Sequence, residues 1–200
     1  MRKYFLIATA LVTLNACSTA SNYNPLDDYQ QLTPATNLPT PVALSNGNFT
    51  VEQVERGQYL VGLLGCGSCH TNGALIGTPN RQQLLAGSDT GIAWSNPLVD
   101  RNPGIVYPAN LTPDIETGIG SWSKQDIIRM IQTGMSKHGG QTLAVMPWPS
   151  YANIHADDIT AIAAYLKSLS PVRHQVPAEV MRGQKAVAPF IHFGVYQSKL

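Results

Sequence analysis

The stretch Cys66-Gly67-Ser68-Cys69-His70 is the most informative part of this 200-residue sequence. Two thiols stand on either side of two small residues, and a histidine follows the second thiol directly. In a helical turn this spacing brings the two sulfur atoms about one turn apart on the same side of the backbone. The small residues between them leave room for a flat group to approach. The pattern therefore predicts that a planar cofactor is held by two sulfur bonds and one imidazole.

Haem attachment is the chemistry that fits this pattern, since each thiol can add to one haem vinyl group and His70 can then ligate the iron. Two other uses of a Cys-x-x-Cys pair fit less well. A thioredoxin-like redox pair follows a strand, whereas the segment before Cys66 has helical periodicity. A zinc site needs a second Cys or His pair at ligand spacing, and the sequence has none.

Composition limits the remaining possibilities. The chain carries a net charge of +1, with 12% charged and 44% hydrophobic residues, so most of it is expected to fold. A near-neutral chain has no strong general affinity for nucleic acid. Three cysteines exclude a disulfide-rich scaffold and a four-thiolate zinc site.

The N-terminus resembles an export signal. Two basic residues precede an apolar run over residues 4–14, which is too short to span a bilayer. The following Leu14-Asn15-Ala16-Cys17 resembles a bacterial lipobox, so we expect residues 1–16 to be a signal peptide and Cys17 to be lipidated. Ser18 favours the outer membrane over inner-membrane retention. The alternative is an ordinary cleaved signal that leaves Cys17 as a free thiol.

Residues 17–49 are predicted to form the lipidated N-terminus and a flexible linker, because they are rich in proline and show no apolar period. Partial docking of this linker on the folded domain stays open. Its apolar residues recur every third position and are compatible with a short helical turn: Tyr23, Leu26, Tyr29 and Leu32.

Three helical segments follow. A capping box at Thr50 and Gln53 opens a helix that runs into the haem motif. A second helix is predicted from Ser123 to Gly134. A third is predicted over residues 157–170 and ends before a proline. No strand pattern of comparable length is present, so the sequence predicts an all-α domain of three or more helices with long loops.

This arrangement resembles the class I cytochrome c fold over residues 50–175. It is most similar to the cytochrome c domains that accompany periplasmic and membrane alcohol, aldehyde and sugar-acid dehydrogenases. Those subunits usually carry several such domains, whereas this chain has one haem motif. Besides that motif, the resemblance rests on Arg56-Gly57-Gln58-Tyr59-Leu60, Asn110-Leu111-Thr112-Pro113-Asp114, Thr117-Gly118-Ile119-Gly120-Ser121-Trp122, Met146-Pro147 and Asp158 through Leu169.

The resemblance also implies a tight crossing of the first and last helices. In this family a glycine lets the two backbones approach, and Gly57 is at the matching position. We expect it to face Ala163, Ala164 or Tyr165.

The sixth iron ligand decides between electron transfer and ligand binding. Met146 is the preferred candidate, because it lies in a proline-bounded loop shortly before the last helix, where class I cytochromes place their thioether. Met135, His138 and His155 stay open as alternatives, while Met130 is predicted to be a core residue.

Weaker expectations concern the surroundings of the haem. Trp122 and Trp148 are candidates to pack on the haem or to donate to a propionate, with simple core packing as the open alternative, and Asn110 is a candidate for a hydrogen bond near a propionate. The carbonyl of Pro79 is a candidate acceptor for the second ring nitrogen of His70. Residues 176–200 form a tail that either straps over the domain or docks a partner.

The sequence therefore predicts a lipid-anchored, periplasmic electron carrier with one covalent haem c, and not an enzyme in its own right. Expected partners are redox proteins: a dehydrogenase, a terminal oxidase or another cytochrome. An electron-accepting subunit of a dehydrogenase complex is the alternative, followed by a haem enzyme or ligand-binding protein with a labile distal site. Loss of residues 1–16 changes the net charge from +1 to +1 − 2 = −1, which favours docking through an apolar patch.

Overall fold

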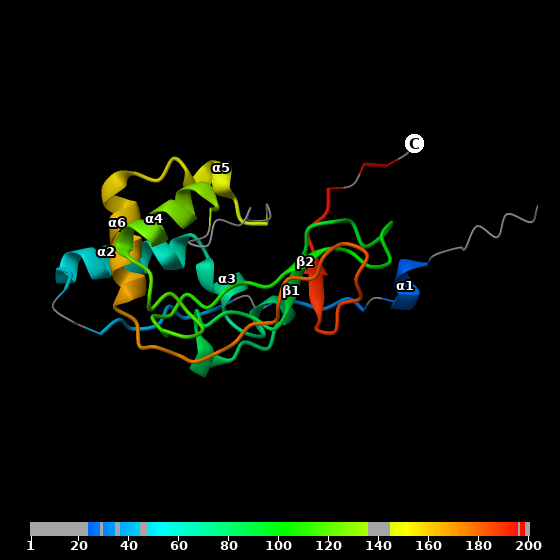
Figure 1. Ribbon diagram of the computed structural model, residues 1–200, viewed down its shortest axis with the longest axis horizontal. Coiled ribbons are helices and arrows are strands. Elements are labelled where there is room, and N and C mark those ends of the chain that lie inside the picture. The colour runs from blue at the N-terminus through cyan, green and yellow to red at the C-terminus, as the bar shows by residue number, and fades with distance from the viewer. Residues whose placement is uncertain are drawn as a thin grey trace, which may run out of the picture.

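The computed structural model describes residues 24–28, 30–34, 37–44, 48–135, 145–195 and 197–198. A helical lobe lies at one end of the molecule and a small sheet towards the other, with α3 between them (Figure 1). The helices are α1 (Pro25–Asp28), α2 (Val51–Leu63), α3 (Cys66–His70), α4 (Lys124–Thr133), α5 (Trp148–Tyr151) and α6 (Ala156–Lys167), with short 3-10 turns at Ala74–Ile76 and Arg81–Gln83. The strands are β1 (Gly91–Ala93), β2 (Ile105–Val106) and β3 (Phe190–His192).

Local capping signals set the starts of the first two predicted helices. Thr50 caps α2, with its hydroxyl accepting from the N–H of Gln53 at 3.2 Å. Ser123 caps α4, with its hydroxyl accepting from the N–H of Asp126 at 3.1 Å. Both are complete capping boxes, as the sequence predicts.

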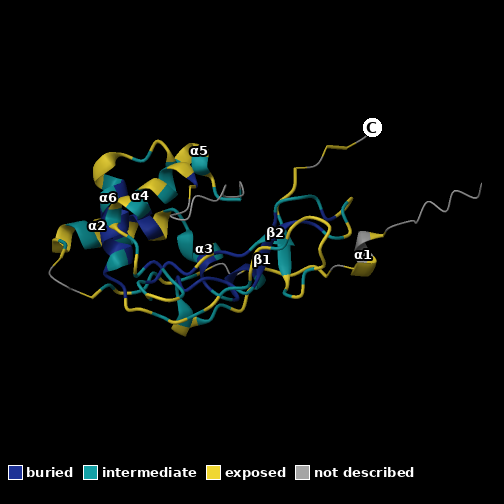
Figure 2. Cartoon of the chain, viewed as in Figure 1, coloured by how far each residue is buried: buried dark blue, intermediate teal, exposed yellow. Residues whose placement is uncertain are grey.

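The main core lies where α2, α4 and α6 meet, and Figure 2 shows buried segments there and along the loops that lead to β1. Gly57 is buried at the crossing of α2 and α6. A methyl group at this position would lie 2.6 Å from the Cβ of Tyr165 and would overlap the carbonyl oxygen of Ala161. The predicted tight crossing is therefore confirmed, with Tyr165 as one predicted neighbour and Ala161 as the other contact.

The small sheet is a feature that the sequence pattern did not predict. Its strand order is β2-β1-β3, with β2 antiparallel and β3 parallel to β1. Strands of two or three residues are too short to show an alternating pattern. The domain is nevertheless mostly helical, as predicted.

The C-terminal segment lies over the domain as far as β3. The N–H of Ile105 donates to the carbonyl of Val180 at 2.8 Å, and the N–H of Val180 donates back at 2.9 Å. Val176, Val180 and Phe190 pack against a second buried cluster of Ala93, Ile105 and Tyr107. The sequence leaves two roles open for residues 176–200, packing over the domain and docking a partner. The structure shows packing over the domain for the segment that ends at β3.

Residues 37–44, here called the N-terminal strap, lie along the helices. The N–H of Leu44 donates to the carbonyl of Ser168 at 2.7 Å. The carbonyl of Pro41 accepts from the hydroxyl of Tyr165 at 2.5 Å and from the amide of Gln58 at 3.4 Å. The sequence predicts a flexible linker as far as residue 49, but these backbone groups are bonded to the domain.

The rest of the predicted linker and leader is described only in part. Leu32 is exposed. Tyr23, Tyr29, the side chain of Leu26, the signal segment and Cys17 lie outside the described residues. None of the helices in the described part of the chain is long and apolar enough to cross a bilayer.

Candidate functional site

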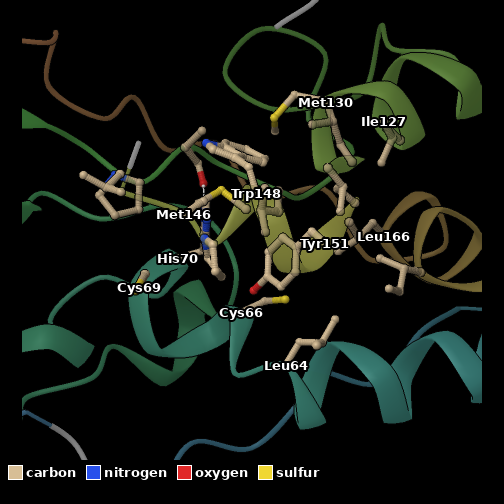
Figure 3. Close-up of a pocket in the computed structure, with 18 of the residues that line it drawn as sticks. Leu64, Cys66, Cys69, His70, Ile127, Met130, Met146, Trp148, Tyr151 and Leu166 are labelled. Atoms are coloured by element: carbon tan, nitrogen blue, oxygen red, sulfur yellow. Dashed lines mark hydrogen bonds between the residues drawn. The ribbon is translucent and has the colours of Figure 1, made fainter. Parts of the chain in front are cut away.

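The short helix α3 carries both thiols and the histidine of the motif. Gly65 precedes it with φ +67°, a left-handed conformation that turns the chain sharply between α2 and α3. This turn directs Cys66, Cys69 and His70 towards one cavity, which all three residues line (Figure 3).

His70 is held by a backbone acceptor. Its side chain is buried, and its Nδ1 lies 2.7 Å from the carbonyl oxygen of Ala109. Because a carbonyl only accepts, Nδ1 carries the proton and Nε2 keeps a free lone pair. Burial lowers the pKa of His70, and the bond to Ala109 partly opposes this effect. The structure thus presents a neutral imidazole, which is the form that ligates a metal.

The acceptor for His70 corrects one sequence expectation. The proposed carbonyl was that of Pro79, which follows the motif closely, whereas the structure uses Ala109. The bond joins residues 39 positions apart, and such a pairing leaves no local signal in the sequence.

Cys66 and Cys69 form no disulfide. Burial raises the pKa of Cys66 to about 11 and also raises the pKa of Cys69. Both groups are therefore protonated at neutral pH. A neutral thiol can add across a carbon–carbon double bond, with sulfur bonding to one carbon and hydrogen to the other. The product is a thioether.

The cavity has a volume of about 330 Å³ and an apolar lining. Its walls come from α3, from residues 106–109 and 111, from α4, from residues 145–148 and 151, and from α6. Figure 3 shows Ile127, Met130, Trp148, Tyr151 and Leu166 around it. No Asp, Glu, Lys or Arg is among the described residues that line it. Such a space suits a large, flat, hydrophobic ligand.

Two methionines reach this cavity. Met146 lines it near His70 (Figure 3), and so does Met130, which the sequence assigned to the core. Met135 does not line the cavity and is 54% exposed. His155 does not line it either, and its side chain is 78% exposed. His138 lies outside the described residues.

Two buried polar groups indicate how the cavity suits a haem. The hydroxyl of Tyr107 and the indole Nε1 of Trp148 have no hydrogen-bond partner within the described chain, and both residues are among those that line the cavity. An unpaired buried donor costs about 1–3 kcal/mol, so each calls for an acceptor such as a propionate. The motif, the apolar cavity and these donors together fit a haem.

Other expectations near the haem turn out differently. Trp122 lines the cavity and also packs against the hydrophobic core, so it makes contacts of both kinds that the sequence leaves open. Asn110 does not line it, and its amide is bonded to Thr112, Thr117 and Val172. The expected position of Asn110 beside a propionate is therefore wrong.

Tyr107, Ala109 and Tyr151 are site residues that sequence reasoning missed. Tyr151 lines the cavity, and burial raises its pKa to about 12. None of the three belongs to a spaced motif. Tyr107 and Ala109 lie just before the Asn-Leu-Thr-Pro-Asp segment, which is the nearest available signal.

Comparison with known proteins identifies the motif-bearing domain. A protein-family model described as "Cytochrome c" matches residues 54–170, which is more than half of the chain. The match covers the haem motif, the cavity-lining helices and Met146.

Several curated proteins are similar to the same region. The fructose dehydrogenase cytochrome subunit of Gluconobacter japonicus is 37% identical over 142 residues, which are 70% of this chain and 25% of that protein. A nicotinate dehydrogenase subunit of Pseudomonas putida is 36% identical over 136 residues, 68% of this chain and 10% of that protein. The cytochrome c subunit of the quinone alcohol dehydrogenase of Gluconobacter oxydans is 34% identical over 123 residues, 61% of this chain and 23% of that protein. The chain thus spans a quarter or less of the length of these three relatives.

Proposed function

The chain belongs to the cytochrome c family, and on this premise we propose that it carries single electrons on one covalently bound haem c with His70 and Met146 as axial ligands. The observation that supports this proposal is the convergence of four side chains on one apolar cavity: Cys66, Cys69, His70 and Met146. When bound, the haem supplies a one-electron iron couple.

Each side chain has a role in the proposed function. The Cys66 and Cys69 thiols would hold the haem through thioether bonds to its two vinyl groups, and addition of S–H across a double bond would need no oxidant. His70 offers Nε2 to the iron while Ala109 holds its other nitrogen. Tyr107 and Trp148 offer their unpaired donors to the propionates. The apolar walls exclude water and so disfavour the more highly charged oxidised iron.

The covalent attachment and the sixth ligand can be tested together. The purified protein is expected to show the pyridine haemochrome spectrum of haem c and to keep its haem in acidic acetone. Oxidised wild-type protein should show the weak red absorption band typical of methionine–iron ligation. Met146→Ala should lose this band, and its reduced form should bind carbon monoxide. Met130→Ala should keep the band, and its reduced form should not bind carbon monoxide.

The opposite result would assign the ligand to Met130, since both methionines line the cavity. Rapid binding of carbon monoxide by the reduced wild-type protein would instead favour the ligand-binding alternative with a labile distal site.

A second candidate function is that of an electron-accepting subunit in a dehydrogenase complex. The names of the three relatives described above support it, because each is a subunit of a dehydrogenase. In this role the chain performs no substrate chemistry and only removes electrons. A dehydrogenase that co-purifies with the chain at constant stoichiometry, and reduces its haem on addition of substrate, would support this role over that of a free carrier.

We also propose export to the periplasm and lipid attachment at Cys17, on the sequence pattern alone. Acyl chains contribute about 0.8 kcal/mol per buried methylene, so two or more give stable anchoring. Wild-type protein should then fractionate with outer membranes, and Cys17→Ser should not carry the lipid. Identical fractionation and identical N-terminal mass of the two proteins would contradict lipidation.

A further inference from the structure

Asn110 lies at the centre of a buried hydrogen-bond network beside the haem cavity. Its side chain is 2% exposed. The Oδ1 atom accepts from the N–H of Thr112 at 2.9 Å and from its hydroxyl at 2.8 Å. The Nδ2 atom donates to the hydroxyl of Thr117 at 3.1 Å and to the carbonyl of Val172 at 2.8 Å. The backbone partners fix which end of the amide is oxygen and which is nitrogen.

This network joins two distant parts of the chain. Thr112 and Thr117 belong to the loop that precedes α4, and Val172 follows α6. The hydroxyl of Thr112 also accepts from the N–H of Val172 at 3.0 Å, and the N–H of His174 donates to the hydroxyl of Thr117 at 3.1 Å. The loop around Asn110 is thus fastened to the chain that leaves the core helix.

The residue before Asn110 is the one that binds the histidine of the motif. The carbonyl of Ala109 lies 2.7 Å from Nδ1 of His70. On either side of it, the carbonyl of Pro108 accepts from the N–H of Ser88 at 3.0 Å, and the N–H of Leu111 donates to the carbonyl of Leu85 at 2.8 Å. The Ala109 peptide therefore has few ways to move while Asn110 is in place.

We propose that Asn110 is a positioning residue for the axial histidine. The Asn110 side chain bonds to Thr112 and Val172 and so restrains the peptide between Ala109 and Asn110. This restraint fixes the direction of the Ala109 carbonyl and thereby the hydrogen bond to His70. This inference rests on the proposed function, in which His70 ligates the haem iron through Nε2.

The physical consequence is a contribution to the reduction potential. A well-placed acceptor on Nδ1–H raises the basicity of the imidazole and its donation to the metal. Stronger donation stabilises oxidised iron and lowers the potential. If the Ala109 carbonyl drifts away, the donation weakens, and the potential rises.

The test compares Asn110→Ala with Ile159→Ala in the holoprotein. Ile159 is a buried core residue on α6 that does not line the cavity, so its truncation destabilises the fold without touching the network. Asn110→Ala should shift the redox equilibrium at least threefold towards the reduced form, about 28 mV at 59 mV per tenfold change. Exchange of the His70 Nδ1 proton in the reduced protein, followed by NMR, should become faster. Ile159→Ala should leave both quantities unchanged.

A potential and an exchange rate equal to those of the wild type in Asn110→Ala would overturn the inference. Equal shifts in Ile159→Ala would do the same, because they would show a general response to destabilisation. Covalent haem is measured first in every variant. Its absence from the wild-type protein would overturn the proposed function, whereas normal haem with unchanged potentials would overturn only the role of Asn110.

A milder pair of variants keeps the test open if Asn110→Ala does not fold. Thr117→Val removes the hydroxyl that Asn110 donates to, while Thr117→Ser keeps it. The valine variant should raise the potential in the same direction, and the serine variant should restore the wild-type value. Equal potentials in these two variants would also count against the inference.

Discussion

Gly57 shows how one absent methyl group governs the packing of two helices. Gly57→Ala would place a carbon 2.6 Å from the Cβ of Tyr165 and into the carbonyl of Ala161. Backbone and a Cβ cannot rotate away, so α2 and α6 must separate. Overpacking of this kind costs about 1–3 kcal/mol. We expect urea unfolding of Gly57→Ala to show a loss of about 2 kcal/mol, despite the better helix propensity of alanine.

Gly62→Ala is the matched control, because Gly62 belongs to the same helix. There the nearest contact of an added methyl is the hydroxyl of Thr40 at 2.9 Å, which can rotate. Alanine gains about 1 kcal/mol of helix propensity over glycine, so this variant should lie within about 1 kcal/mol of the wild type. Equal losses in the two variants would contradict the tight crossing at Gly57.

The carboxylate of Asp114 makes the stability of the loop before α4 depend on pH. Its carboxylate accepts from the hydroxyl and the N–H of Thr117, both at 2.7 Å, and these bonds lower the pKa of Asp114. Since the folded pKa lies below the unfolded value of about 3.9, the stabilisation is complete above that value and is lost as the pH falls through the folded pKa. The difference in urea midpoint between wild type and Asp114→Asn should be constant near pH 7 and shrink below about pH 4. A difference independent of pH would contradict this assignment.

Sequence reasoning located a residue correctly where its position depends on its near neighbours. The Cys66-Gly67-Ser68-Cys69-His70 spacing predicted which side chains share one cavity, and the Met-Pro pair predicted that Met146 would join them. It failed for Ala109 and Asn110, because both act through bonds to residues far away in the chain. Every residue has a backbone carbonyl, so a sequence pattern cannot show which carbonyl will accept a hydrogen bond.

For helices and strands, too, features set by near neighbours were predicted and features set by distant residues were not. Thr50 and Ser123 begin their helices through contacts three residues away, and both starts were predicted. The sheet depends on pairing β1 with β3, whose residues Ile92 and Ile191 lie almost a hundred positions apart. Such non-local pairing has no signature in strands this short.

The N-terminal strap is proline-rich, so its composition predicts a linker, yet it packs on the domain. Proline prevents Pro41 from donating a backbone bond, but its carbonyl still accepts, and Tyr165 uses it. Tyr165→Phe removes this bond and should lower the free energy of unfolding by about 1 kcal/mol. Hydrogen exchange at the N–H of Leu44, which is bonded to Ser168, should become faster as the strap loosens.

Tyr59→Phe is the control for the strap, because Tyr59 lies on α2 and is 58% exposed. Exposed substitutions usually change stability by less than about 0.5 kcal/mol. Unchanged exchange at Leu44 in Tyr165→Phe would show that the hydroxyl of Tyr165 does not hold the strap.

At the scale of the whole molecule, charge is sparse where electrons are proposed to pass. The cavity is bounded by the helical lobe on one side and by residues 106–109 and 111 on the other, and its described lining carries no Asp, Glu, Lys or Arg. The chain without residues 1–16 has a net charge of +1 − 2 = −1. Long-range steering therefore has little charge to act on, so we expect contact between redox proteins to depend on apolar complementarity around the cavity.

Electron self-exchange between two copies of the holoprotein tests this view without any other partner. NMR line broadening in partly reduced samples gives the second-order rate constant. The Debye length falls from about 30 Å at 0.01 M salt to about 3 Å at 1 M, so repulsion between strongly charged faces would be relieved by salt. We expect the rate constant to change by less than about threefold over this range. In Val145→Glu, which adds a carboxylate to the cavity lining, exchange should be slower at low salt and recover at high salt, since two like charges then meet at the contact. A tenfold or larger increase with salt in the wild-type protein would mean that a local charged patch, and not the apolar mouth, governs the encounter.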